Sequence, residues 1–185
     1  MIILAIVVIF LVIVAIWLVT IYNRMVRLAV SCDEGASEIE VQLKRRYDLI
    51  PNLIETVKGY ASHEKGVFAE VTEMRTAAEK TSGVGPEAAK AEGDLSKALV
   101  NLMAVAENYP DLKASTNFLA LQDELTATED RLSAARRFYN STVKAVNSAV
   151  RSIPSKWVAP MAGLSGREFF EVEDDLQRAA PRVSF

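Results

Sequence analysis

The stretch that decides the fold of this chain is residues 25–61, MVRLAVSCDEGASEIEVQLKRRYDLIPNLIETVKGYA. Its apolar residues recur at steps of three or four, the spacing that places side chains on one face of an α-helix. They are Met25, Ala29, Cys32, Ala36, Ile39, Leu43, Tyr47, Ile50, Ile54, Val57 and Ala61. The stripe is narrow and close to a heptad seam, which favours long coiled-coil-like packing with a left-handed supercoil.

The stripe continues less cleanly through Phe68 to Ala78, so residues 25–80 are predicted to form one helix. If straight, such a helix would be about 80 Å long at 1.5 Å per residue. The glycines and proline of residues 81–86, TSGVGP, end it.

Two more helices follow from the same spacing, one over residues 87–108 and one from Phe118 to just before Pro154. Three long amphipathic helices with short connections form an antiparallel bundle most economically. We therefore expect an all-α protein whose residues 23–153 form an elongated antiparallel bundle.

The C-terminal residues 154–185 differ from the bundle in their proline and glycine content. They include an acidic, helix-like run from Phe169 to Arg178 and an extended end, PRVSF. We expect a proline-containing tail with a short helix that packs on the bundle.

Residues 1–22 contain no charged side chain, and residues 2–19 are continuously apolar. About 20 residues of helix span the hydrocarbon core of a bilayer, and a lone segment satisfies its backbone there only as a helix. Trp17 and Tyr22 lie near its C-terminal end, where amphipathic rings prefer the headgroup level. The segment is therefore predicted to be a single transmembrane helix that anchors the chain in lipid.

A cleaved signal peptide fits this segment poorly, because the apolar run is too long and no A-x-A site follows it. Residues 29–32, AVSC, loosely resemble a lipoprotein cleavage box, but Arg24 and Arg27 separate them from the apolar run. The same two arginines flank the span on its C-terminal side, so the positive-inside rule predicts that residues 23–185 lie in the cytoplasm. The expected location is the bacterial inner membrane, crossed once.

The charges of the chain nearly balance, since 21 Lys and Arg against 24 Asp and Glu give a net charge of −3. A protein that binds nucleic acid needs a strongly basic face, so we expect no nucleic-acid partner. The balance also argues against a domain that lies flat on anionic lipid, which would need a basic amphipathic face.

Few side chains suited to enzyme chemistry are present. His63 is the only histidine, and Val67 stands where a zinc-protease motif would need its second histidine. Cys32 is the only cysteine and lies on the apolar stripe, where a small buried thiol is the simpler interpretation. No nucleophile–base pair or set of metal ligands is visible, so we expect no catalytic residue, no metal and no cofactor.

Residues 44–53, KRRYDLIPNL, place three consecutive cations and then a proline in the first helix of the bundle. Arg45 is expected to point away from the apolar stripe, while Lys44 and Arg46 flank it. Asp48 stands four residues after Lys44, a spacing that supports an exposed helix. A solvated basic face with ordinary ion pairs is therefore the plainer interpretation.

Pro51 gives this stretch a second interpretation. It removes one backbone donor and crowds the carbonyl of Tyr47, so we expect a kink near residues 47–50. The kink would either fit the rod around its neighbours or act as a hinge. A polar patch beside it would contact a partner, and its members are Arg45, Arg46, Asp48 and Asn52.

Polar residues also gather on the predicted third helix. Arg136, Arg137 and Asn140 lie beside core positions, and Asn147 follows Asn140 by one heptad. A polar residue in a seam often determines register or oligomeric state at some cost in stability. The same residues would equally fit a solvent-facing side, and the spacing does not decide between the two.

Several stretches together resemble the LemA family. They are Tyr22-Asn23, VQLKRRYDLIPNLIETVKGYASHE (41–64), ENYPDLKASTNF (107–118), AARRFYN (134–140), FFE (169–171) and the final PRVSF. They cover nearly the whole chain in the family's order, although Ala36 and Ser37 stand where the family often has a tryptophan. The resemblance implies an N-terminal anchor followed by a long antiparallel helical bundle, with no catalytic activity or cofactor.

The similarity of this family to certain magnetosome membrane proteins implies work in organising or shaping membranes. Its members often accompany TPM-domain membrane proteins, which are therefore expected partners. The leading hypothesis is a non-enzymatic scaffold that forms a homo-oligomer and organises membrane or envelope proteins. Because the span has no glycine and no small-xxx-small pair, the bundle would have to drive this assembly. The second hypothesis is a monomeric adapter that captures a membrane protein through the residue 44–52 patch or the C-terminal tail.

Overall fold

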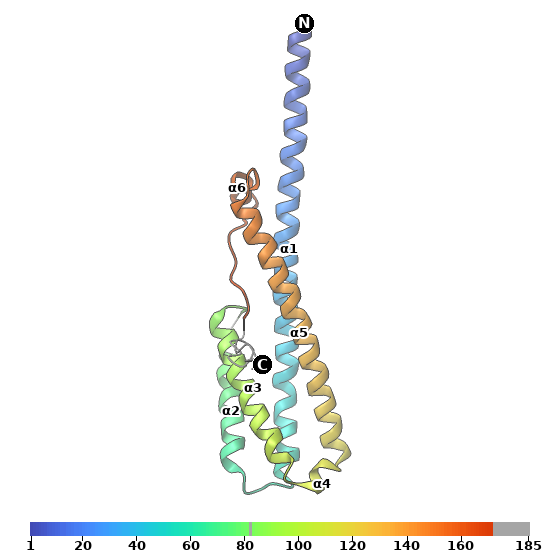
Figure 1. Ribbon diagram of the computed structural model, residues 1–185, viewed down its shortest axis with the longest axis vertical. Helices are drawn as coiled ribbons and strands as arrows, with labels where there is room; N and C mark the ends of the chain where they lie inside the picture. Colours follow the sequence, from blue (N-terminus) through green and yellow to red (C-terminus); the bar gives the residue numbers. More distant parts are fainter. Residues whose placement is uncertain (82, 172–185) are drawn as a thin grey trace, which may run out of the picture.

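The computed structural model describes residues 1–81 and 83–171, and every regular element among them is helical (Figure 1). The elements are α1 (Ile2–Lys58), α2 (Lys65–Lys80), α3 (Pro86–Ala106), α4 (Pro110–Lys113), α5 (Thr116–Arg151), α6 (Ser155–Val158) and the 3-10 helix η1 (Ala159–Ala162). The prediction of an all-α protein is confirmed.

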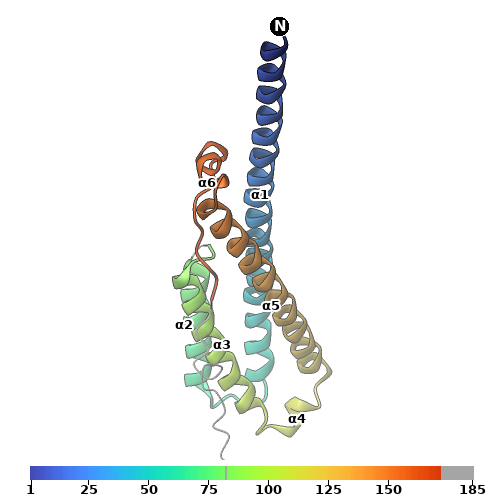
Figure 2. The same cartoon turned by 45° about the horizontal axis from the view of Figure 1, so that its top comes forward.

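The predicted elongated antiparallel bundle is found, but four long helices form it where the sequence predicted three. α1 and α5 lie side by side, and α2 and α3 form a hairpin against the lower half of this pair (Figure 1, Figure 2). The chain reverses its direction after α1, after α2 and around the short helix α4.

The prediction of one helix over residues 25–80 is wrong, because the chain turns back at residues 59–64. The amide of Ala61 donates a 2.9 Å hydrogen bond to the carbonyl of Val57 and so closes the end of α1. Ala61 remains buried in the turn, and Phe68 of α2 returns to the same core. An apolar stripe keeps its period whether a helix continues or folds back onto its own core, so the spacing could not reveal the reversal.

The stripe of residues 25–61 forms the α1 side of the core, and the predicted face of α5 lies against it. Side chains with 0% exposure are Met25, Ile39, Ile50 and Val57 on α1 and Leu132, Val143 and Val146 on α5. Burial of each such aliphatic side chain stabilises the fold by roughly 1.5–3 kcal/mol. Gly35 lets the two helices approach closely, because a Cβ there would lie 3.2 Å from the Tyr139 Cα.

The first part of α1 stands clear of the bundle at the top of Figure 1. It contains a stretch that is long and apolar enough to cross a membrane, and none of that stretch is buried. α1 is one unbroken helix of 57 residues, or about 85 Å at 1.5 Å per residue. The apolar segment and the first helix of the bundle are therefore parts of the same continuous helix.

After α5 the chain forms α6 and η1 at the end of the bundle nearest the apolar segment and then runs back along the bundle (Figure 1). Gly163 adopts a left-handed conformation, with a φ of 65°, where this reversal begins. The acidic helix predicted from Phe169 to Arg178 is not found at residues 169–171, which are not helical. The rest of that run and the final PRVSF lie outside the described residues.

Candidate functional site

The stretch KRRYDLIPNL lies in the lower half of α1, where side chains of α2, α3 and α5 reach it. Its exposed members are Lys44, Arg45, Asp48, Pro51 and Asn52. Arg46, in contrast, is only 3% exposed, and the interpretation of Arg46 as part of a solvated face is wrong. Because side chains of α2, α3 and α5 reach this part of α1, Arg46 beside the apolar stripe is covered, whereas Lys44 beside the same stripe stays exposed.

Arg46 joins α1 to α3 and α5 through a buried polar network. Its Nη1 lies 3.1 Å from Oε2 of Glu92, and its Nη2 donates a 2.8 Å hydrogen bond to Oγ of Ser96, both on α3. The same Nη1 lies 3.5 Å from Oε2 of Glu129 on α5. The hydroxyl of Tyr47 donates to Oε1 of Glu92, so both oxygens of this carboxylate are engaged from α1.

A second arginine extends the network on α5. Nη1 of Arg136 lies 3.7 Å from Oε1 of Glu129, and its guanidinium carbon lies 5.3 Å from the centre of the Phe170 ring. That separation is typical of a cation–π contact. Among the described residues, Nε and Nη2 of Arg136 and Nε of Arg46 are buried without a hydrogen-bond partner. The two arginines thus carry more donors than the two carboxylates accept.

Burial dominates the ionisation of this network. It raises the pKa of the Glu92 carboxyl, although Tyr47 and Arg46 both favour the carboxylate form. Burial, and then the hydrogen bond to Glu92, raises the pKa of Tyr47, so its phenol stays protonated and remains a donor. Burial also lowers the pKa of Arg136. Removing one partner of such a network leaves a buried charge uncompensated, so α1, α3 and α5 depend on one another here.

α1 continues through Pro51 as one helix. Proline carries no amide hydrogen, so the carbonyl of Tyr47, four residues earlier, lacks its helical donor. Arg75 of α2 supplies a replacement, since its Nε donates a 2.8 Å hydrogen bond to that carbonyl. Nη1 of Arg75 also lies 3.5 Å from Glu79 on its own helix. The predicted hinge point is thus tied to the neighbouring helix.

Asn140 and Asn147 bind the segment that runs back along the bundle, residues 163–171. The side-chain amide of Asn140 donates to the carbonyl of Phe170 at 3.0 Å and accepts from its backbone amide at 2.9 Å. Asn147 makes the same pair of bonds with Arg167, at 2.9 Å each. We name this arrangement the tail clamp. It gives both asparagines a role within the chain that the sequence did not suggest.

The spacing of the tail clamp follows from the geometry of the two partners. Seven residues of helix rise about 10.5 Å, and three residues of extended chain, from Arg167 to Phe170, cover about 10 Å. Glu168 lies between Arg167 and Phe170 in this segment, and its carbonyl accepts a 3.0 Å hydrogen bond from the hydroxyl of Tyr139. Nη2 of Arg167 lies 3.0 Å from Oδ1 of Asp33, which ties the segment to α1 as well. Phe170 is 1% exposed and completes the core at this level.

The remaining predicted residues lie outside these contacts. Arg137 is exposed and donates a 2.9 Å hydrogen bond to Oγ of Ser133 on its own helix, so it does not join Arg136 in the network. Exposed residues where α1 leaves the bundle are Trp17, Tyr22, Arg24 and Arg27. Across residues 1–81 and 83–171, no group of three or more His, Cys, Asp and Glu side chains could hold a metal ion.

Sequence reasoning missed the acidic half of the network. Glu92 falls at helical spacing between Ala88 and Leu95 on the apolar face of α3, and a charged residue on such a face is a signal that it has a buried partner. Ser96 and Arg75 carried no comparable signal, because their roles depend on which turn of α1 each helix meets.

Comparison with known proteins places the chain in a family. A sequence profile of the LemA family matches residues 35–185, which include the buried network and the tail clamp. Magnetosome protein MamQ 2 of Paramagnetospirillum magneticum is 24% identical over 175 residues, or 81% of this chain and 64% of the relative. Magnetosome protein MamQ of Magnetospirillum gryphiswaldense is 24% identical over 174 residues, or 80% of this chain and 64% of the relative.

A third relative shares the family name. Protein LemA of Metamycoplasma hominis is 26% identical over 157 residues, which cover 82% of this chain and 69% of the relative. The chain spans just under two thirds of the length of the magnetosome relatives, at 64%. Because the family profile covers most of the helical bundle, this chain belongs to the LemA family.

Proposed function

We propose that this protein is a non-enzymatic membrane scaffold that self-associates through its bundle and organises other membrane proteins. The observation that carries the proposal is the continuity of α1, one helix of 57 residues that bears the apolar segment and then runs the length of the bundle. Copies anchored in one bilayer would hold their bundles at the same height, which raises the effective concentration of one bundle beside the next.

Other features support this proposal. Membership in the LemA family, similarity to proteins named as magnetosome proteins and the apolar part of α1 all point to membrane association. The net charge of −3 leaves little electrostatic repulsion between copies. We propose further that α1 crosses the bacterial inner membrane once and that the bundle lies in the cytoplasm, because Arg24 and Arg27 flank the span on the bundle side.

The test is the mass of the full-length protein in nanodiscs, prepared with an excess of empty discs and measured at micromolar concentration. The proposal expects a defined multimer. A monomer under these conditions would contradict the proposal that the protein is a self-associating scaffold. A matched variant in which leucine replaces each of residues 2–19 separates the two parts of α1. It should form the same multimer if the bundle drives assembly, and a monomer would assign assembly to the apolar segment.

A monomeric adapter is the second candidate, and the exposed polar residues of KRRYDLIPNL favour it. Because Arg46 is buried, the available patch consists of Lys44, Arg45, Asp48 and Asn52. We infer that such a patch would bind a charged surface of a membrane protein, with a TPM-domain protein as the partner to try first.

The adapter is tested by capture of that TPM-domain protein in detergent. The variant Lys44→Glu with Arg45→Glu reverses the exposed charges and leaves the buried network intact. It should lose capture while its circular dichroism stays unchanged. Lys90→Glu, a charge reversal at an exposed position of α3, is the matched control and should capture normally. Normal capture by the double variant would exclude this patch as the binding site.

A further inference from the structure

Three large apolar side chains are exposed together in the short segment between α5 and residues 163–171. Ile153 is 71% exposed, Trp157 is 66% exposed and Met161 is 76% exposed. Small or medium side chains of the same segment face the protein, since Val158 is 7% exposed and Ala159 is 1% exposed. The segment therefore buries its smaller apolar residues and presents its larger ones to the outside.

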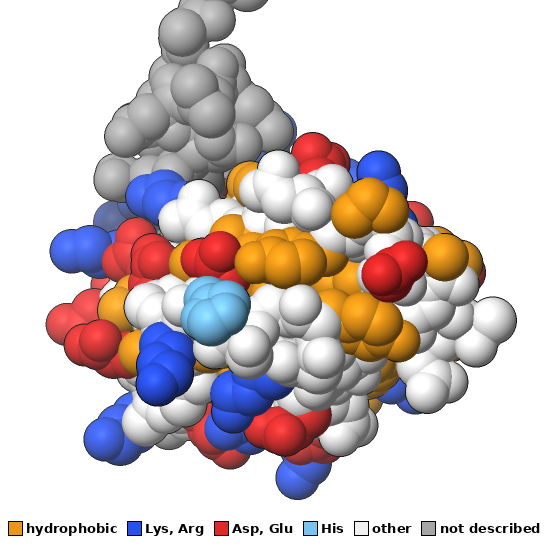
Figure 3. Space-filling view, turned by 90° about the horizontal axis from the view of Figure 1, so that it is seen from below, with side chains coloured by type: hydrophobic (Ala, Val, Ile, Leu, Met, Phe, Trp, Pro, Cys, Tyr) orange, Lys and Arg blue, Asp and Glu red, His pale blue; other side chains and the backbone are white. Residues whose placement is uncertain are grey.

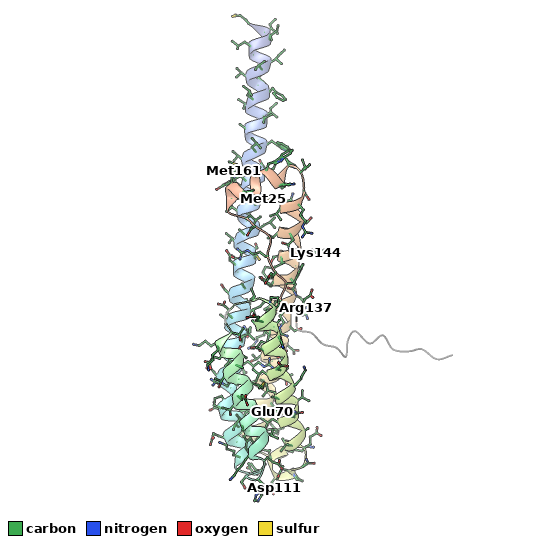
Figure 4. All side chains as sticks on the ribbon, turned by 90° about the vertical axis from the view of Figure 1, so that its left-hand side faces the viewer. Met25, Glu70, Asp111, Arg137, Lys144 and Met161 are labelled. Atoms are coloured by element: carbon green, nitrogen blue, oxygen red, sulfur yellow. The ribbon has the colours of Figure 1, made fainter. Side chains whose placement is uncertain are left out.

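This segment lies where α1 leaves the bundle. Both α6 and η1 pack against α1, and they form the end of the bundle nearest the apolar segment (Figure 1, Figure 2). Met161 lies close to the level of Met25 (Figure 4). Met25 follows Tyr22, the predicted end of the span, by three residues, or about 4.5 Å along the helix. The exposed apolar side chains thus lie at the height of the membrane surface that α1 would leave.

The charges around this end are basic. No Asp or Glu occurs between Asp130 and Glu168 in the sequence, and the first acidic residue of the chain is Asp33. Two exposed cations, Arg151 and Lys156, lie next to or within the segment in sequence. Two more, Arg24 and Arg27, lie where α1 leaves the bundle. At the opposite tip of the bundle, charges of both signs are mixed with apolar side chains (Figure 3). The cationic character is therefore a property of the end that faces the apolar segment.

We propose that residues 153–161 form a second, peripheral membrane contact beside α1. Ile153, Trp157 and Met161 enter the boundary between headgroups and acyl chains, where tryptophan and aliphatic side chains are favourable. Arg151 and Lys156 then lie against anionic headgroups. This inference rests on the proposed anchoring by α1. Two points of attachment would set the tilt of the bundle and its rotation about α1, which one helix alone would leave free.

The experiment uses the fluorescence of the two tryptophans of the full-length protein in nanodiscs that contain anionic lipid. In the variant Trp17→Phe, Trp157 is the only tryptophan. We expect its emission to be blue-shifted and to be quenched by phospholipids brominated in the upper part of the acyl chain. Emission of a solvated indole without quenching overturns the inference. Blue-shifted emission that bromolipid does not quench also overturns it, since a protein surface, such as a second copy, would then cover Trp157.

Two control variants separate this result from the anchor and from background quenching. In Trp157→Phe, only Trp17 reports, and quenching of Trp17 shows that α1 is in the bilayer. If Trp17 is quenched and Trp157 is not, the peripheral contact is contradicted while the anchoring by α1 stands. If Trp17 is not quenched, the anchoring is contradicted, and so is the inference that rests on it. The variant Leu119→Trp, made with both natural tryptophans replaced by Phe, reports from an exposed position near the N-terminal end of α5 and should not be quenched.

Discussion

Nε of Arg75 donates a 2.8 Å hydrogen bond to the backbone carbonyl of Tyr47. This carbonyl is the one that Pro51 deprives of its helical donor. A contact between α1 and α2 therefore replaces a contact within α1, and α1 passes a proline without leaving that acceptor unpaired. The hairpin of α2 and α3 is thereby tied to α1 at the turn where α1 has lost a hydrogen bond of its own.

Arg75→Ala should lower the free energy of unfolding by about 1–2 kcal/mol, because the Tyr47 carbonyl loses its charged donor. Pro51→Ala restores an amide hydrogen that can donate to the same carbonyl. In that background Arg75→Ala should cost about 1 kcal/mol less, a coupling that a double-mutant cycle measures. Denaturant unfolding in detergent, followed by circular dichroism, gives the free energies of unfolding of the wild-type protein, the two single variants and the double variant. Additive effects would show that Arg75 acts through Glu79 or packing instead.

Glu92→Ala should destabilise the protein by about 3–5 kcal/mol, because it leaves the Arg46 guanidinium buried without its main counter-charge. Replacing both partners, as Arg46→Met with Glu92→Leu, should recover most of that loss. Glu124→Ala, at an exposed position of α5, is the control and should change stability by less than about 0.5 kcal/mol. A double variant no more stable than Glu92→Ala would mean that Ser96 and Glu129 need the charged pair.

The stability difference between the wild-type protein and Glu92→Gln should depend on pH. Burial raises the pKa of Glu92 above 4.5 in the folded chain, so the folded state binds this proton more tightly than the unfolded state. The contribution of Glu92 is therefore fully present below pH 4.5 and is lost as the pH rises through the folded pKa. The difference, wild type minus variant, should fall over this interval by at most about 1.4 kcal/mol per pH unit. A difference that rises with pH would show that pairing with Arg46 outweighs burial.

Asn147→Ala and Asn140→Ala should release the tail clamp at different points. Each substitution removes two hydrogen bonds, worth about 0.5–1.5 kcal/mol apiece. Hydrogen exchange should accelerate most at the Arg167 amide in the first variant and at the Phe170 amide in the second, because these amides donate to the two side chains. Asn147→Asp keeps the acceptor and loses the donor, so its effect should be intermediate. Equal acceleration at both amides in each variant would mean that the segment detaches as one unit.

Gly35→Ala should destabilise the protein by about 1–3 kcal/mol through overpacking between α1 and α5. A Cβ there would lie 3.1 Å from Cδ1 of Phe138 and 3.2 Å from the Cα of Tyr139, and backbone atoms cannot give way as side-chain ends do. Gly66→Ala on α2 is the matched control, since nothing lies within 4 Å of its Cβ. That variant should be roughly 0.5–1 kcal/mol more stable, because alanine favours the helix. Thermal unfolding of both variants in the same detergent measures the contrast.

The helical bundle and its core could be predicted from the spacing of apolar residues alone. Met25, Ile39 and Ile50 are buried where the stripe predicted, and α5 buries Leu132 and Val143 in the same way. The apolar segment of residues 2–19 could likewise be predicted from its length and its lack of charged residues. These features depend on local periodicity and composition, which the order of residues contains directly.

The reversal after Lys58 and the partners of the polar residues were decided only by the tertiary structure. Periodicity states that a residue faces a core, but not which helix returns to meet it or at what height. Arg46 finds Glu92 because a turn at residues 59–64 brings α2 and α3 back beside α1. Asn140 and Asn147 match the extended segment because a heptad of helix is as long as three extended residues. Such pairings join positions far apart in the chain, and their register is set by the packing of whole helices.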